Sequence, residues 1–157
     1  MAATAAGPFD VVTARLDALI AWSDAALVAS ASEHAAELLA LGEAILENWL
    51  AARDATSTSD TFEGFRLLAL QRQGARGDAS FNACRETCRE LVYHHNLVRL
   101  DPTHADTARR LRLAAMVARH LALFIGGKLE TAGLGEFCCS SRPLRRDDAN
   151  SQPAAIA

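Results

Sequence analysis

The chain contains few aromatic residues and almost no lysine. Phe, Trp and Tyr make up 6% of its 157 residues, and Lys128 is the one lysine among 16 basic residues. Because β-sheets favour aromatic and β-branched side chains, this scarcity argues against a sheet protein. Alanine and leucine dominate instead, which is the composition of helices packed against helices. The shortage of lysine and the abundance of alanine also suggest a bacterial source with a GC-rich genome.

No long hydrophobic run is present. The longest, from Leu113 to Ile125, is interrupted by Arg119 and His120 and is shorter than the roughly 20 residues that a membrane-spanning helix needs. The start of the chain lacks the basic and apolar segments of a secretory signal peptide. We therefore expect a cytoplasmic protein outside the membrane, with its four cysteines as reduced thiols.

The short motifs of familiar enzymes are also missing. There is no P-loop, no Rossmann glycine pattern, no nucleophile elbow and no CxxCH haem site. A ferritin-like di-iron centre needs Glu-x-x-His on two helices, and this chain has none, since His34 and Glu37 stand in the reversed order. These absences argue against a familiar enzyme and leave an unfamiliar one open.

Apolar residues recur at helical spacing along most of the chain, and capping or turn residues separate the periodic segments. The helices predicted from these patterns begin near Asp10, Ser30, Asp60, residue 80 and Thr103. The apolar face of the second predicted helix consists of Leu38, Gly42, Ile45 and Trp49. The length suits a single domain that buries its own core.

Local signals predict where these helices begin and which side they bury. Ser30, followed three residues later by Glu33, forms a capping box at the start of the second helix. The first helix is expected to continue without a break to Leu27. Phe62 and Phe65 are expected inside the third helix, on its buried side.

The predicted fold class is all-α. The fifth helix is apolar on nearly every side over residues 113–125, which is typical of a central, mostly buried helix. Residues 140–157 are polar and aperiodic, as in a disordered tail. We therefore predict a single-domain bundle of four to five antiparallel helices over residues 10–139, with a flexible N-terminus at residues 1–9.

Charge is distributed unevenly along the chain. Residues 1–63 hold ten acidic and two basic residues, a net charge of −8. Residues 64–157 hold nine acidic and fourteen basic residues, a net charge of +5, and the two parts sum to −3. This asymmetry permits an acidic helical layer to pack against a basic one, within the chain or between copies of it. Two differently charged solvated surfaces are the simpler alternative.

Cys84, Cys88, His94 and His95 lie close together in the fourth predicted helix. Residues four apart share a helix face with Cβ atoms about 5–6 Å apart, so the two cysteines could bind one zinc or copper ion. Such an ion needs two more ligands, and His95 lies too far along the helix to be an easy third. Buried cysteine also behaves as a small hydrophobic residue, so packing in the core is the alternative.

Cys138 and Cys139 could in principle complete a four-thiolate site. If the fourth and fifth helices form a hairpin, however, this second pair lies about 30 Å along the fifth helix from Cys84. A reversal at the glycines of residues 126–135 would be needed to bring the pairs together.

Histidines near the predicted hairpin turn form a second candidate metal site. His94 and His95 end one helix, while His104 and Asp106 begin the next, and three imidazoles with a carboxylate could bind zinc. Histidines at helix ends also interact with the C-terminal dipole or cap carbonyls, which is the alternative interpretation.

Asn82, Arg85 and Arg89 give the fourth predicted helix the outline of a DNA-recognition helix. The preceding loop is long for a helix-turn-helix, the helix is apolar and the chain is acidic overall, so we do not expect a nucleic-acid partner.

The sequence therefore favours a non-catalytic, cytoplasmic helical-bundle protein that works through protein contacts. It would be an accessory or regulatory subunit, or a homo-oligomer. The alternative function is a metal-binding or thiol-redox-responsive protein that uses Cys84 and Cys88, with zinc or copper as the metal.

Overall fold

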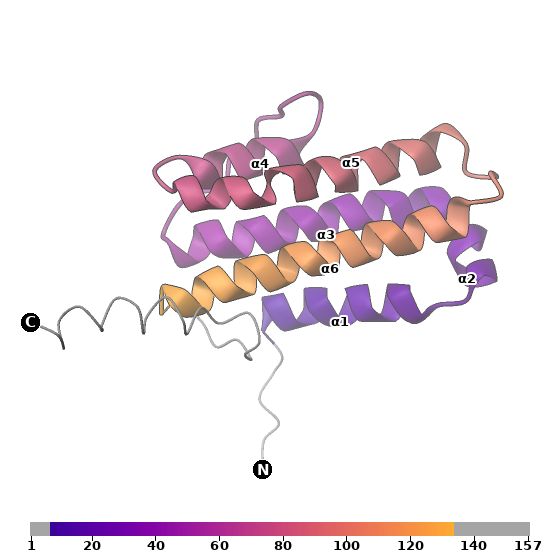
Figure 1. The fold of residues 1–157 in the computed structure, drawn as a ribbon, viewed down its shortest axis with the longest axis horizontal. Coiled ribbons are helices and arrows are strands. Elements are labelled where there is room, and N and C mark those ends of the chain that lie inside the picture. Colours follow the sequence, from indigo (N-terminus) through magenta and orange to yellow (C-terminus); the bar gives the residue numbers. More distant parts are fainter. Residues whose placement is uncertain (1–6, 134–157) are drawn as a thin grey trace, which may run out of the picture.

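The computed structural model describes residues 7–133, which are mostly helical (Figure 1). The elements are α1 (Pro8–Ala21), α2 (Asp24–Ala29), α3 (Ala31–Ala52), α4 (Arg66–Ala75), the 3-10 helix η1 (Ala79–Cys84), α5 (Arg85–Leu100) and α6 (Thr107–Thr131). No strand occurs within residues 7–133, so the all-α prediction is confirmed for them. The predicted tail at 140–157, Cys138, Cys139 and residues 1–6 lie outside the described residues.

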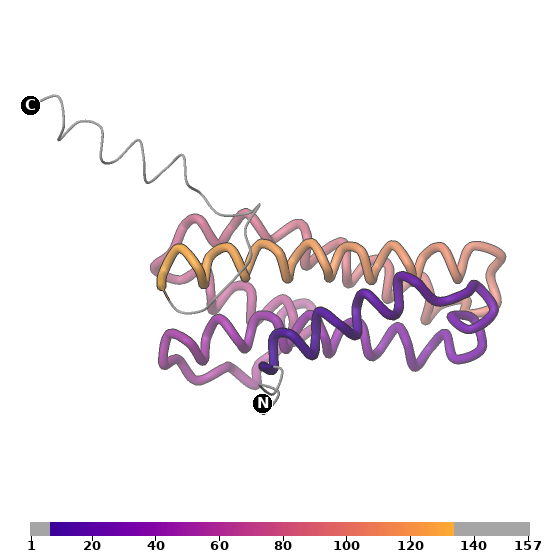
Figure 2. The backbone as a smooth tube through the Cα atoms, turned by 90° about the horizontal axis from the view of Figure 1, so that it is seen from below, coloured from indigo at the N-terminus to yellow at the C-terminus, as the bar shows by residue number. Residues whose placement is uncertain are grey.

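The long helices α1, α3, α5 and α6 lie along the long axis of the molecule (Figures 1 and 2). Helix α6 is the central element, because it packs against α1, α2, α3 and α5. Helix α4 packs on α3 and α5 at one side, and η1 joins it to α5. None of the helices within residues 7–133 has the length and apolar character required to cross a membrane.

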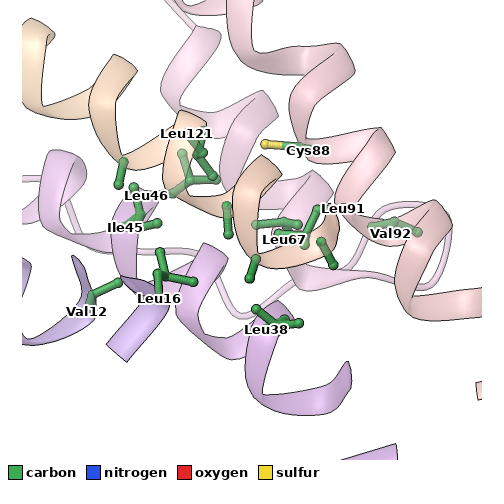
Figure 3. Packing of buried hydrophobic residues seen from close by; sticks show 14 of the residues in the cluster. Val12, Leu16, Leu38, Ile45, Leu46, Leu67, Cys88, Leu91, Val92 and Leu121 are labelled. Atoms are coloured by element: carbon green, nitrogen blue, oxygen red, sulfur yellow. The ribbon is translucent and has the colours of Figure 1, made fainter. Parts of the chain in front are cut away.

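The core forms where the apolar faces of these helices meet (Figure 3). The predicted face of α3 is buried, from Leu38 through Gly42 and Ile45 to Trp49. Residues 113–125 of α6, which are apolar on nearly every side, are mostly buried or half-buried, as predicted, and alanines such as Ala118 on the inner side permit close helix packing. Met116 on its outer side is 51% exposed.

The first predicted helix is in fact two helices, α1 and α2. The Ser23 hydroxyl accepts a hydrogen bond from the Ala26 amide at 3.2 Å and so caps the start of α2. The prediction of one continuous helix to Leu27 is therefore wrong. The Arg112 side chain fixes this corner by donating to the Trp22 carbonyl at 2.9 Å. Helix α3 begins directly after Ser30, as predicted, but the predicted capping box is wrong, because the Ser30 side chain makes no capping hydrogen bond.

The third predicted helix begins later than expected. The backbones of Phe62 and Phe65 bond to each other at 3.0 Å in both directions, which closes a tight turn instead of a helical one. Glu63 and Gly64 adopt positive φ values of 53° and 85° inside it. Helix α4 therefore starts at Arg66, and the two phenylalanines precede it.

The next predicted helix also differs, because residues 79–84 form the 3-10 helix η1 before α5 begins. Helix α6 continues through Gly126 and Gly127 without reversing direction.

Arginines of residues 64–133 pair with carboxylates of residues 7–63. The pairs join Arg66 to Glu43 and Glu47, Arg89 to Glu63, Arg112 to Asp24, and Arg119 to Asp17. The charge asymmetry of the sequence is thus partly compensated within one chain. Exposed pairs of this kind each contribute only about 0–1 kcal/mol, so they orient the helices more than they stabilise them.

Candidate functional site

The two cysteines lie at the junction of η1 and α5. Cys84 is the last residue of η1, and Cys88 follows one turn later. Both are fully buried, and the Cys84 thiol donates to the Phe81 carbonyl oxygen at 3.2 Å. Figure 3 shows Cys88 in the same buried cluster as Leu91 and Leu121. Both side chains therefore belong to the core.

The environment makes these two thiols chemically different. A hydrogen bond from Cys88 lowers the pKa of Cys84, and the Gln71 side chain acts in the same direction. The hydrogen bond with Cys84 and burial raise the pKa of Cys88 well above its usual value. Gln71 Nε2 also donates to the Phe81 carbonyl at 3.2 Å. Cys84 is consequently the thiol more easily deprotonated.

Lys128 lies close to this pair, and the sequence patterns did not place it in a site. Its Nζ donates to Ser80 Oγ and lies 2.8 Å from Asp78 Oδ2. It also lies 5.0 Å from the centroid of the Trp49 ring, within cation–π distance. Its positive charge contributes to the lowered pKa of Cys84. The one feature of the sequence that could have drawn attention to Lys128 is that it is the single lysine of the chain.

A pocket of about 560 Å³ opens beside Lys128, between α3, η1 and α6. Trp49 and Phe124 form its apolar wall, while Arg53 and His120 supply polar groups. The cysteines do not line it. A molecule in this pocket would contact the lysine and the aromatic rings rather than a thiol.

The predicted metal ligands are not assembled into one group. Within residues 7–133, no group of three or more His, Cys, Asp or Glu side chains could hold a metal ion. Cys84 and Cys88 adjoin each other, as predicted, but no third ligand from the described residues joins them. Whether a metal binds this pair stays a prediction.

Each predicted histidine has its own surroundings. His94 Nε2 lies 3.6 Å from Glu90 Oε1, and its buried Nδ1 makes no hydrogen bond within the described part of the chain. The His95 ring packs edge-on against Phe65, and desolvation lowers its pKa. His104 Nδ1 accepts the Asp106 amide at 2.9 Å in the loop before α6.

A second pocket, of about 470 Å³, lies between α4, η1 and α5. It contains four arginine side chains, those of Arg72, Arg76, Arg85 and Arg89. The sequence analysis named only Arg85 and Arg89, which lie on one helix. The first two join them because α4 packs against η1 and α5.

Exposed apolar side chains occur on both of the adjoining helices α5 and α6. Tyr93 and Leu100 on α5 are 59% and 85% exposed, and the half-buried Leu97 lies between them on the same helical face. Met116 and the half-buried Leu113 share a face of the adjoining α6. These five residues form what we call the α5–α6 face.

Comparison of the chain with protein-family models, with curated proteins and with solved structures finds no match.

Proposed function

We propose that the protein is a non-catalytic, cytoplasmic helical bundle that works through protein contacts and pairs with a second copy of itself through the α5–α6 face. The observation that carries this proposal is the exposure of Tyr93, Leu100 and Met116 on two adjoining helices. Clustered apolar residues on a surface typically mark sites of protein contact. We also propose that the bundle consists of four to five antiparallel helices.

Charge complementarity favours a second copy as the occupant. The exposed Glu86 and Glu90 flank the face near the start of α5, and the exposed Arg109 flanks it near the start of α6. Because α6 runs back along α5, Glu90 and Arg109 lie toward opposite ends of the two helices, while Glu86 is already 3.5 Å from Arg85. In a two-fold pair whose axis crosses the helices, a surface patch contacts its own equivalent, so Glu90 of one copy would meet Arg109 of the other.

The oligomeric state of the full chain tests this proposal. Analytical ultracentrifugation over a wide concentration range should show a dimer, and Leu100→Ser with Met116→Ser should weaken it at least tenfold. Val11→Ser is the matched control, because Val11 is 58% exposed on α1, outside the face.

A charge exchange makes the test specific for the arrangement. Glu90→Arg should weaken the dimer, and adding Arg109→Glu should restore it. A chain that stays monomeric at every concentration would contradict self-association, and a dimer insensitive to these variants would place its interface elsewhere.

A second candidate function is a response to oxidants through Cys84 and Cys88. The observation that favours it is the interaction of the two thiols together with the lowered pKa of Cys84. Peroxide would oxidise Cys84 to a sulfenic acid with release of water, and Cys88 would displace a second water to form a disulfide. Because both thiols are buried, this reaction requires a local opening at η1.

Mass spectrometry after peroxide treatment tests this candidate in a chain with Cys138→Ser and Cys139→Ser. The oxidised chain should lose two hydrogen atoms and regain them with a reductant, and Cys84→Ser should abolish the change. If the folded chain keeps both thiols while the unfolded chain is oxidised, the cysteines serve packing alone. Stoichiometric zinc or copper in the purified chain would support the metal-binding alternative instead.

A further inference from the structure

The arginine pocket between α4, η1 and α5 has a lining with basic groups and no acidic ones. Arg72 and Arg76 come from the end of α4, while Arg85 and Arg89 come from the first two turns of α5. The other polar side chains that line it are the amides of Gln71 and Asn82. Four arginine residues thus line one cavity of about 470 Å³, and the Arg72 guanidinium stacks over the Phe62 ring, 3.9 Å from its centroid.

The carboxylates around the pocket neutralise only some of this charge. Arg89 donates two hydrogen bonds to the Glu63 carboxylate, of 2.9 and 3.2 Å, and the Glu86 carboxylate lies 3.5 Å from the Arg85 guanidinium. Within residues 7–133, no carboxylate lies within 4.0 Å of Arg76. Like charges held near one another repel, so an anion in the pocket would lower the energy of the arrangement.

The start of α5 adds further positive potential at the same place. Helix α5 has 16 residues, and the residue before it, Cys84, makes no side-chain capping hydrogen bond. Its first turn, which includes Arg85, lines the pocket. The Arg85 backbone N–H is bonded to the Asn82 carbonyl of η1, so the start of α5 contributes the positive end of its helix dipole rather than a free N–H at this residue.

We propose that this pocket binds a small ligand that carries two or more phosphate groups. Guanidinium groups bind phosphate oxygens in bidentate fashion, and several arginines around one cavity match a ligand with several such oxygens. The volume lies within the range of small-molecule sites, about 300–1,000 Å³. Nucleic acid fits less well, because Glu63 and Glu86 adjoin the pocket and the chain is acidic overall.

Calorimetric titration of the full chain with pyrophosphate tests the proposal. Pyrophosphate should bind one site per chain, and orthophosphate should bind at least tenfold more weakly because it reaches fewer guanidinium groups. Arg76→Gln and Arg85→Gln should each weaken pyrophosphate binding about tenfold, the effect of losing a charge-assisted hydrogen bond. Arg99→Gln is the matched control, because this exposed arginine of α5 does not line the pocket.

Circular dichroism and the melting temperature show whether each variant remains folded. Pyrophosphate should also raise the melting temperature of the unmodified chain and of Arg99→Gln more than that of Arg76→Gln. Absence of binding, or equal binding by all variants, would overturn the proposal. Citrate bound as tightly as pyrophosphate would overturn the assignment to phosphate, and binding of DNA without binding of pyrophosphate would replace the small ligand with a nucleic acid.

Discussion

Gly74 lies so close to the Phe81 ring that no side chain fits between them. A Cβ atom at Gly74 would lie 2.4 Å from Phe81 Cε1, well inside van der Waals contact. Phe81 has little freedom to move away, because it is fully buried, stacks on Trp49 at 5.9 Å and meets Phe124 edge-on at 6.2 Å. This glycine therefore allows η1 to cross α4 closely.

Gly74→Ala should accordingly destabilise the protein. The expected loss in the free energy of unfolding is about 1–3 kcal/mol, even though alanine is the better helix former. Gly42→Ala should cost less, because its Cβ would meet the flexible methyl groups of Leu91 and Leu67 at 2.8 and 3.2 Å. Urea unfolding of the two variants measures this order, and an equal or reversed order would contradict it.

Trp49→Ala should be among the most destabilising single changes. The indole is buried, stacks on Phe81 and lies under the charges of Lys128 and Arg53. Truncation of a large aromatic side chain in a core costs roughly 3–5 kcal/mol. Thermal and urea unfolding should show this loss, with Val28→Ala as an exposed control on α2. A loss well below 1 kcal/mol would show that the indole is not part of the core.

The two buried cysteines should react slowly with a thiol reagent in the folded protein. In a background of Cys138→Ser and Cys139→Ser, Cys84 and Cys88 should be modified only as fast as the chain opens. Replacing both with alanine should cost about 1–2 kcal/mol through lost packing, without changing the metal content. Rapid modification of one thiol under native conditions would show that the junction of η1 and α5 is open.

Acid should weaken the protein partly through Asp78. The hydrogen bond from Lys128, followed by that from Ser80, lowers the pKa of Asp78 below its ordinary value of 3.8. A carboxyl group whose pKa is lower in the folded state stabilises the fold above the unfolded-state pKa. That stability is fully present above about pH 5 and is lost as the pH falls through 3.8 toward the folded-state pKa.

The Asp78→Asn variant tests the origin of this pH dependence. It should lose about 1 kcal/mol at neutral pH and show a shallower loss of stability between pH 5 and pH 3 than the unmodified chain. Asp60→Asn is the control, since Asp60 is exposed and has no ion pair in the part of the chain described. Identical pH profiles for the chain and Asp78→Asn would rule out the contribution of this carboxylate.

The sequence predicted the helical fold well because apolar spacing reports directly on which face of a helix is buried. The inner face of α3, from Leu38 to Trp49, followed from that spacing alone. The breaks were harder to predict. The division at Ser23 depends on a hydroxyl cap and on Arg112 from a distant helix, and the turn at Glu63 places a non-glycine residue at positive φ.

The candidate sites were predictable only where one helix carries them. Cys84 and Cys88 share a face of one segment, so their proximity could be inferred from spacing. The surroundings of Lys128 combine residues of α3, η1 and α6, and the arginine pocket needs α4 against α5. Such arrangements arise from tertiary packing, which local periodicity does not encode.

The pairing of α1 and α2 with α6 has a consequence for how the chain acquires its fold during synthesis. Asp17 and Asp24 are made early, whereas their partners Arg119 and Arg112 are made about ninety to one hundred residues later. Contacts so distant in sequence cannot form until α6 has left the ribosome. Until then the sides of α1, α2 and α3 that pack on α6 stay uncovered, even though α3 can already pack on α4 and α5. A nascent chain that stalls before α6 would be a substrate for chaperones or proteases rather than a smaller folded protein.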